Sequence, residues 1–466
     1  MQNKDIELSD NTDVRYDISV QVDDNSQPDN TETNNDVFIP AANDVDDDTY
    51  IPDDEVIDED APVPEKKGNT FGMLFNLVNT TVGAGILALP YAFKEMGIVM
   101  GLLSLLLMGV LAAATLHFLS EASQIRRKYS YKALALDIFQ TKWAGIAFES
   151  TVVIVGAGAM MSYTIIIGQL SSSLMTVFLK LVQAPQNVID VLGNTILLTF
   201  IIMLVIVFPL CCLRHIQFLG YTSLLSILSA LFVVVAIVIR CAQKGISGQL
   251  PGQISLVGSF SSILAAFPVV AFSLTSHVTL LPMIEQMRSP TVKKVSAVGA
   301  ASVLVCISMY LSMAVSGYVL FAENTQDNIL NSFDPSDTLI VFAKLCVLVV
   351  VILSYPLFLY STRECSETVF FAERPFTWLR WIATAAIICM TTFVVSIIFP
   401  KINMVLGLSG ATGSTLAASV FPSIFYFKIS TKRANKIIAA VIGTFTGLTG
   451  IVSTIVITID IIKSLT

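Results

Sequence analysis

Long apolar blocks separated by short polar segments dominate the pattern of this chain. A helix of about 20 apolar residues crosses a bilayer whose hydrocarbon core is about 30 Å thick, and eleven blocks reach that length. The pattern therefore predicts an all-α polytopic membrane protein with eleven transmembrane helices. The blocks lie near 71–96, 98–121, 145–179, 191–212, 216–240, 257–285, 295–321, 339–362, 377–399, 402–427 and 437–461.

Composition separates the first 67 residues from this apolar domain. The whole chain is 54% hydrophobic and 13% charged, whereas soluble domains carry about 25% charged residues. Residues 1–67 hold 21 acidic and 4 basic side chains and a single Phe, Phe38. Such a segment buries too little apolar surface to offset the entropy of ordering, so we predict a disordered acidic tail over 1–67 and a transmembrane domain over 68–466.

The loop charges predict the orientation of the domain. With eleven spans, 16 Lys and Arg residues lie in loops on the side of the N-terminal tail and 7 on the other side. Cytoplasmic loops carry the excess of Lys and Arg, so the tail is expected to be cytoplasmic. Residues 322–337 would then form a short polar loop on the outer face, and Tyr129 to Phe139 a short amphipathic helix on the cytoplasmic surface.

The first block contains residues that disfavour a continuous helix. Its sequence over 76–91 is NLVNTTVGAGILALPY, with Gly83 and Gly85 two residues apart and Pro90 five residues later. Gly destabilises helix interiors and Pro lacks an amide donor. We predict a break at 83–85, where amides at a helix start would face an anionic group and freed carbonyls a cation. The alternative is an unbroken Gly-rich face for helix packing.

The sixth block repeats these features. Pro268 and Pro282 bracket a polar patch, FSLTSH over 272–277, in an otherwise apolar stretch. Two interrupted helices five spans apart are typical of an inverted repeat whose site lies at mid-membrane. Spans one to five and six to ten would form the two halves, and the eleventh would be an addition. Phe272 and Ser273 join the predicted substrate site.

His277 is the ionisable residue that lies well inside a span. Ionisable groups at that depth are costly and often functional, and an imidazole with an ordinary pKa of about 6.5 could carry a proton. The alternative is a neutral His that is hydrogen-bonded within the bundle. The eighth block contains Ser354, but a lone Ser usually bonds to its own helix carbonyl, and the sequence alone does not single it out.

These motifs resemble those of the amino acid/auxin permease family. The runs NTTVGAGILALPYAF, FSLTSHVTLLPMIEQMR and LSYPLFLYSTRE carry the resemblance, which is greatest to the sodium-coupled neutral amino acid transporters and the fungal vacuolar amino acid transporters. It implies a LeuT-type 5+5 inverted repeat with one extra helix and alternating access. The substrate would be held by main-chain groups at Thr80, Thr81, Val82, Gly83, Ala84 and Gly85.

The resemblance also implies an ion site. An Asn of the first helix and a Thr of the eighth are implicated in sodium binding in this family, and the matching positions are Asn79 and Ser354, the latter placed by Pro356 and Arg363. Ser keeps the hydroxyl oxygen of Thr and lacks its methyl group. Sodium and protons both remain candidate coupling ions, and no other cofactor is expected.

The leading hypothesis is therefore ion-coupled secondary transport of amino acids. Neutral substrates are favoured because no acidic residue lies in the predicted site. The alternative is a membrane amino-acid sensor that signals through a cytoplasmic protein partner of the tail. No metal motif, nucleophile elbow or pair of catalytic carboxylates indicates an enzyme, and no nucleic-acid partner is expected. The vacuolar or lysosomal membrane and the plasma membrane are both candidate locations.

Overall fold

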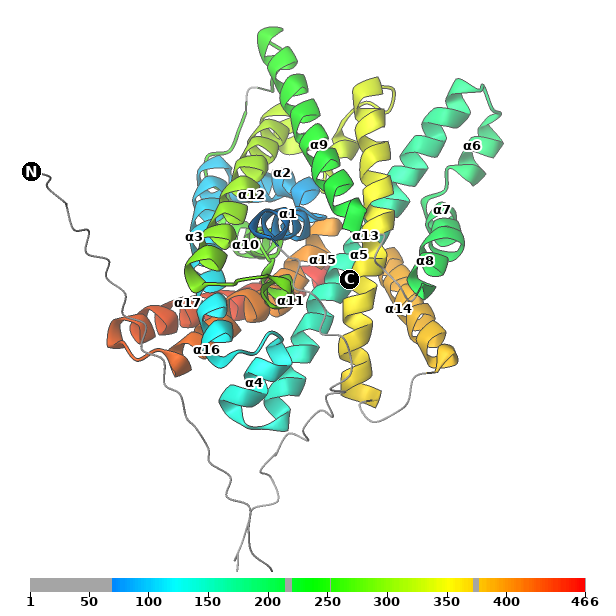
Figure 1. The fold of residues 1–466 in the computed structure, drawn as a ribbon. Helices are drawn as coiled ribbons and strands as arrows, with labels where there is room; N and C mark the ends of the chain where they lie inside the picture. The colour runs from blue at the N-terminus through cyan, green and yellow to red at the C-terminus, as the bar shows by residue number, and fades with distance from the viewer. Residues whose placement is uncertain (1–68, 214–219, 252, 372–376, 466) are drawn as a thin grey trace, which may run out of the picture. The chain divides into compact units, whose positions relative to one another are not determined.

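The computed structural model describes residues 69–213, 220–251, 253–371 and 377–465 (Figure 1). All of them belong to one compact unit, 48–466. The predicted disordered tail, 1–67, lies outside the described residues. Within these ranges the chain forms helices and irregular connections without a β-strand.

The number of spans agrees with the hydrophobic pattern. Ten helices of the described ranges are long and apolar enough to cross a membrane, and a bent helix pair at the start makes eleven. All eleven predicted blocks are confirmed. The spans are α1 and α2 (Thr70–Thr81, Gly85–Met96), α3 (Ile98–Arg126), α5 (Lys142–Leu181), α7 and α8 (Thr195–Ile202, Phe208–Cys212), α9 (Gly220–Ile246), α10 and α11 (Phe260–Ser273, His277–Gln286), α12 (Val292–Phe321), α13 (Thr338–Phe371), α14 (Trp378–Ile398), α15 and α16 (Ile402–Ser409, Phe421–Ile429) and α17 (Arg433–Leu465).

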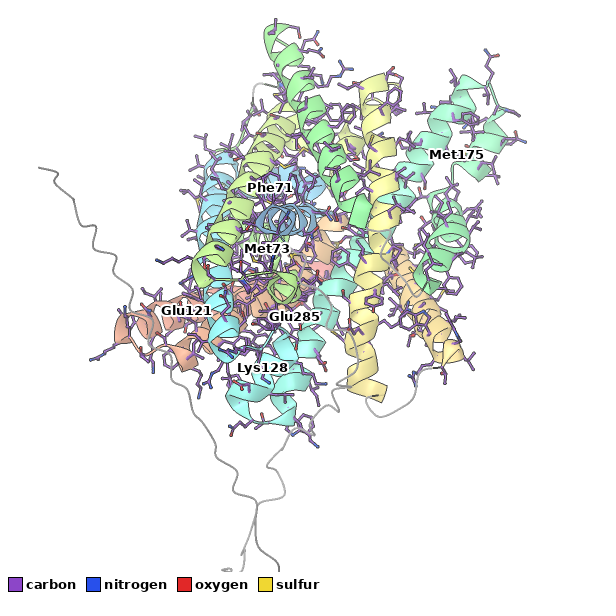
Figure 2. All side chains as sticks on the ribbon, in the orientation of Figure 1. Phe71, Met73, Glu121, Lys128, Met175 and Glu285 are labelled. Atoms are coloured by element: carbon purple, nitrogen blue, oxygen red, sulfur yellow. The ribbon has the colours of Figure 1, made fainter. Side chains whose placement is uncertain are left out.

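Exposed apolar side chains cover the outside of the bundle. On α1, Phe71 is 66% exposed, whereas Met73 on its inner side is 4% exposed (Figure 2). Leu103, Val110 and Leu304 on α3 and α12 are also more than half exposed. Apolar surface of this extent is favourable against lipid and unfavourable against water, so the chain is an integral multi-pass membrane protein.

The short helix α4 (Tyr131–Phe139) confirms the predicted amphipathic segment between spans two and three. Ser130 caps it by accepting a 3.1 Å hydrogen bond from the amide of Ala133. Its apolar side packs on α5, and the Tyr131 hydroxyl donates to the carbonyl of Ala417 at 3.0 Å. We call the membrane face that carries α4 the α4 face. Because the spans alternate in direction, residues 322–337 lie at the opposite face.

Two of the spans contain π-helical turns, which often accompany functional sites. One lies between α7 and α8 at Met203–Val207, and two lie between α15 and α16 at Gly410–Ser414 and Leu416–Val420. At the second place the backbones approach closely, since a Cβ on Gly410 would lie 2.8 Å from the carbonyl carbon of Pro268 in α10. A glycine here lets span ten pack directly against the broken sixth span.

Residues 322–337 are more deeply inserted than a simple polar loop. Asn328 is fully buried, and its amide donates to the side-chain oxygen of Gln169 on α5 at 3.1 Å. The Asp327 carboxylate accepts a 2.9 Å hydrogen bond from the amide of Ile402 at the start of α15. Burial raises the pKa of Asp327 above its ordinary value, although the amide of Ile402 opposes the shift. The loop thus joins α5 to α15, which its polar composition did not indicate.

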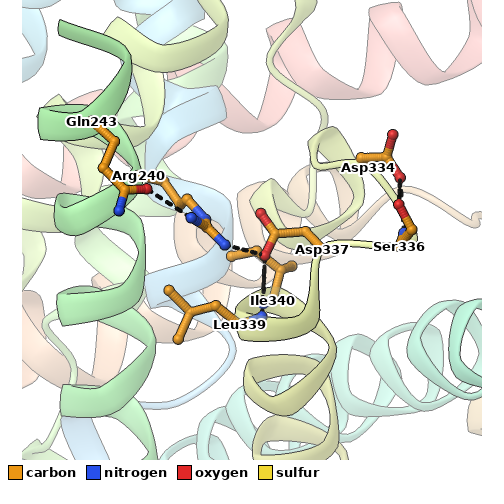
Figure 3. A network of polar contacts seen from close by, with 7 residues as sticks. All are labelled: Arg240, Gln243, Asp334, Ser336, Asp337, Leu339 and Ile340. Carbon is orange, nitrogen blue, oxygen red and sulfur yellow. Dashed lines mark hydrogen bonds and ion pairs between the residues drawn. The ribbon is translucent and has the colours of Figure 1, made fainter. Parts of the chain in front are cut away.

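An ion pair joins α9 to α13 at the face opposite α4 (Figure 3). Arg240 Nη2 lies 2.6 Å from Asp337 Oδ1, and the same oxygen accepts the amide of Leu339 at 3.1 Å, which caps α13. Both charged side chains are partly exposed, so the pair adds modest stability and mainly fixes geometry. It holds spans five and eight together at one end, and both line the cavity described below.

Candidate substrate site at two broken helices

The first span is broken where the glycines predict it. Helix α1 ends at Thr81, α2 begins at Gly85, and their axes differ by 52°. No side chain caps α2, and the amides of Ile86 and Leu87 make only long bonds of 3.4 and 3.3 Å to the carbonyls of Gly83 and Ala84. The start of α2 therefore presents weakly bonded amide donors and the positive end of the helix dipole.

The Thr hydroxyls before the break are engaged within their own helix. Thr80 Oγ1 donates to the carbonyl of Asn76 at 2.9 Å, and Thr81 Oγ1 to that of Leu77 at 2.7 Å. In this conformation the two residues offer main-chain groups rather than side chains to a ligand. Their predicted role through the main chain is compatible with this geometry and stays a prediction.

The sixth span is interrupted too, although among the described helices only the first span bends by more than 40° at its break. Helix α10 ends at Ser273, and α11 begins at His277 without a side-chain cap. The Ser273 hydroxyl donates to the carbonyl of Val269 at 2.7 Å, so it too bonds within its own helix. The predicted interruption around 273–277 is confirmed, although the hydropathy of 260–286 is that of a single span.

The two breaks lie in direct contact. A Cβ on Gly85 would collide with the side chain of Ser273 and would lie 3.0 Å from its Cα. On another side, the Tyr310 hydroxyl of α12 lies 2.6 Å from the carbonyl oxygen of Thr81 and 2.8 Å from that of Ser273. The structure thus brings together two segments that are nearly 190 residues apart in sequence.

A small cavity of about 40 Å³ lies at the first break. Val82, Gly83 and Ala84 of the predicted site line it, whereas the other predicted substrate residues do not. No charged side chain of the described ranges lines it. The remaining lining residues are Ile86 and Leu87 of α2, Tyr163 and Ile166 of α5, Ser226, Ser229, Ala230 and Val233 of α9, and Val347, Val350 and Val351 of α13.

Phe272, another of the predicted substrate residues, points elsewhere. Its ring edge would lie 3.7 Å from a Cβ on Gly158 of α5, so Phe272 packs at the junction of α10 with α5. The hydroxyl groups at the cavity come instead from Tyr163, Ser226 and Ser229, which the sequence did not single out. Tyr163 is close to the break, since its Oη would lie 3.1 Å from a Cβ on Gly83.

Asn79 and Ser354 do not line the cavity. The Asn79 amide donates to the Ser223 hydroxyl of α9 at 3.1 Å, and its buried Oδ1 has no hydrogen-bond partner among the described residues. Ser354 is buried on the same side of α13 as the cavity-lining valines, one turn beyond Val350 and Val351. A buried, unpartnered amide oxygen is an unsatisfied acceptor and a candidate cation ligand.

His277 is fully buried and does not line the cavity. Its Nε2 lies 2.9 Å from the Thr115 hydroxyl of α3, which in turn donates to the carbonyl of Leu111 at 2.8 Å. Because the Thr115 proton is directed to this carbonyl, the Thr115 oxygen accepts a hydrogen bond from Nε2–H of His277. This geometry supports the alternative of a His that is hydrogen-bonded within the bundle, and direct proton coupling stays a prediction.

Two paired, broken helices in an eleven-span bundle are the features of a LeuT-type transporter fold. The chain is similar to MhsT, seen in its crystal structure in complex with L-phenylalanine, with a TM-score of 0.54 and 12% sequence identity. The match covers 85% of this chain and 100% of that chain. The likeness shows the fold, with its 5+5 inverted repeat and, in this chain, an eleventh helix.

Residues 66–463 match the family described as "Transmembrane amino acid transporter protein". This range covers the whole bundle from before α1 nearly to the end of α17, and the chain belongs to that family. The family resemblance inferred from the three motifs is confirmed.

Proposed function

We propose that the protein is a secondary active transporter of neutral amino acids, with its substrate site at the break between α1 and α2. The observation that carries the proposal is the uncapped start of α2 beside a cavity whose lining, in the described part of the chain, includes no charged side chain. Amides at a helix start favour an anionic group, and carbonyls at a helix end favour a cation. An α-amino acid carries both charges on adjacent atoms and fits such a junction.

The walls of the cavity support the neutral class of substrate. The α-carboxylate would bind the amides at Gly85 and Ile86, and the ammonium group the carbonyl of Val82. The substrate side chain would then face the aliphatic groups of α5, α9 and α13. A charged substrate side chain would be buried here without a partner, which is costly.

Two hollows that include charged side chains lie on either side of the breaks and support alternating access. One, of about 230 Å³, is lined by α2 and α10 and includes Glu95 and Lys401. The other, of about 290 Å³, is lined by α4, α5, α11 and α13 and includes Lys132 and Glu149. Neither shares a lining residue with the cavity at the break. This suits a closed site between two routes that open in turn.

Uptake into proteoliposomes is the decisive measurement. We expect the purified full chain to carry labelled neutral aliphatic amino acids and to carry Lys and Glu at least tenfold more slowly. Uptake should be measured with a sodium gradient, with a pH gradient and with neither. Empty liposomes are the control, and absence of flux for every amino acid in both directions would contradict the proposal.

Coupling to a cation near Asn79 and Ser354 is the second part of the proposal. The support is the buried Asn79 Oδ1, which lacks a hydrogen-bond partner among the described residues, and the buried hydroxyl of Ser354. Amide and hydroxyl oxygens are neutral ligands that suit a hard cation such as sodium, and the pH gradient tests the proton instead.

We expect Ser354→Ala to raise the cation concentration needed for half-maximal uptake by about tenfold, because one oxygen ligand is lost. Ser366→Ala is a matched control on the same helix, since within the described part of the chain its hydroxyl donates to the carbonyl of Thr362 at 2.7 Å. Uptake should be titrated with sodium at fixed pH and with protons at zero sodium. An unchanged response to both ions in Ser354→Ala would rule out a cation ligand at this position.

The proposals about which membrane holds the protein and what its N-terminal tail does rest on sequence patterns. The loop charges support a cytoplasmic N-terminus, and the family resemblance supports a vacuolar, lysosomal or plasma membrane location. A sensor function through a protein partner of residues 1–67 is tested by deleting them. Unchanged flux with loss of partner binding would favour it.

A further inference from the structure

In both broken spans the first half-helix ends at the same hydroxyl group, that of Tyr310. The last residues of α1 and α10 are Thr81 and Ser273, and the carbonyl oxygens of both lie within 2.8 Å of Tyr310 Oη. All three residues are at most 5% exposed. Carbonyls at helix ends carry partial negative charge, so two such ends converge here on one point.

This convergence requires a positive group between the two helix ends. Two buried acceptors with like partial charge repel each other, and each is costly without a donor. A cation or a hydrogen-bond donor relieves both problems, and in transporters the ends of half-helices often coordinate a cation. The phenolic proton of Tyr310 occupies that position in this chain.

The position of the hydroxyl is fixed by an unbroken helix. Tyr310 lies on α12, which packs against α1, α2, α3 and α9. Cys306 one turn before it and Ala314 one turn after it are fully buried, so the ring has little freedom to move. On its other side Ser273 abuts Gly85, the first residue of α2. The ends of α1 and α10 and the start of α2 therefore meet around Tyr310 and Ser273. These are three of the four half-helix ends at the two breaks.

We infer that Tyr310 is a positioning residue that sets the two broken spans against each other and so shapes the amino-acid site. One proton serves two carbonyls, so a displacement of either half-helix weakens the shared hydrogen bond. Tyr310 does not line the cavity, and it acts through the main chain of Thr81 and Ser273. The part of this inference that concerns transport rests on the proposed function, whereas the part that concerns the breaks does not.

The chain offers a matched control for testing this. Tyr318 lies on the same helix two turns later, is also fully buried, and its hydroxyl accepts a 2.9 Å hydrogen bond from the amide of Ser255. Tyr310→Phe and Tyr318→Phe each remove one buried hydroxyl from α12. Only Tyr310→Phe removes the hydroxyl that contacts the two breaks.

Amide hydrogen exchange of the full chain in detergent is the first test. In Tyr310→Phe we expect at least fivefold faster exchange at both breaks, read from the amides of Gly83 and Thr275, which now bond to the carbonyls of Thr81 and Phe272. In Tyr318→Phe the breaks should be unchanged and exchange near Ser255 faster. Unchanged exchange at either break in Tyr310→Phe would overturn the inference.

Uptake into proteoliposomes is the second test. We expect Tyr310→Phe to raise the KM for a neutral amino acid at least tenfold, with Tyr318→Phe close to the unmodified protein. An equal KM in the two variants would contradict a role at the site. Because exchange is measured without substrate, a protein that carries no amino acid would contradict the proposed function and leave the test of the two breaks intact.

Discussion

Gly85→Ala is expected to reduce amino-acid uptake at least tenfold while the protein still inserts and folds. The added methyl group would collide with Ser273 and lie 3.0 Å from its Cα. Ser273 cannot easily retreat, because its carbonyl is bonded to Tyr310. Overpacking of this kind costs about 1–3 kcal/mol. This free-energy cost arises where the two breaks touch. The larger side chain of Gly85→Leu should abolish uptake.

The structure predicts different effects of substitution at Gly85 and at Gly83. A Cβ on Gly83 would meet only the Tyr163 hydroxyl, at 3.1 Å, and a side-chain end can move more easily than a backbone. Gly83→Ala should therefore be milder than Gly85→Ala, and Gly83→Leu should still block transport because it fills the cavity. The measurement is initial uptake at several substrate concentrations, normalised to the amount of folded protein in the liposomes.

Gly299→Ala provides the control for a glycine replaced in a transmembrane helix. Gly299 is buried in α12, and its Cβ would make ordinary contacts of 3.5 Å with Leu116. We expect near-normal uptake for this variant. Equal activity of Gly85→Ala and Gly299→Ala would show that close contact between the breaks is not needed for transport.

The sequence predicts both breaks because their causes are local. Gly83 and Gly85 disfavour a continuous helix by their own conformational properties. The prolines lie within the half-helices and not at the breaks, since Pro268 is inside α10 and Pro282 inside α11, but they flank the polar patch in which the sixth span is interrupted. Hydrophobic length likewise predicts the eleven spans, since the bilayer sets a minimum for each. Such features need no knowledge of tertiary contacts.

The groups that complete the site could not be predicted in this way. Tyr310 and Thr81 are 229 residues apart, and Tyr310 is one aromatic residue among many in apolar helices. Tyr163, Ser226 and Ser229 reach the cavity only because α5 and α9 pack beside the first break. By contrast, Phe272 and Ser273 have the right position in sequence, yet their side chains bond or pack within the bundle. Residue type indicates chemistry, but only packing fixes the direction of a side chain.

Ala230→Leu is expected to block uptake by filling the cavity at the first break. Ala230 is 9% exposed on α9 and lines the cavity of about 40 Å³, which three additional carbon atoms would largely occupy. The bundle should still form, because α9 keeps its apolar surface and the break itself is unchanged. We expect at least a tenfold loss of uptake, with the largest loss for the bulkiest aliphatic substrate.

Two further variants distinguish filling of the cavity from general damage to α9. Ala242→Leu makes the same substitution at an exposed position of this helix and should leave uptake nearly unchanged. Val351→Ala enlarges the cavity from α13, so the double variant Ala230→Leu/Val351→Ala should regain part of the lost uptake, first for the smallest substrates. Recovery of this kind requires that α9 and α13 line one common space beside the uncapped start of α2. If Ala230→Leu alone carried bulky aliphatic amino acids at the normal rate, the side chain of the substrate would have to lie elsewhere than in this cavity.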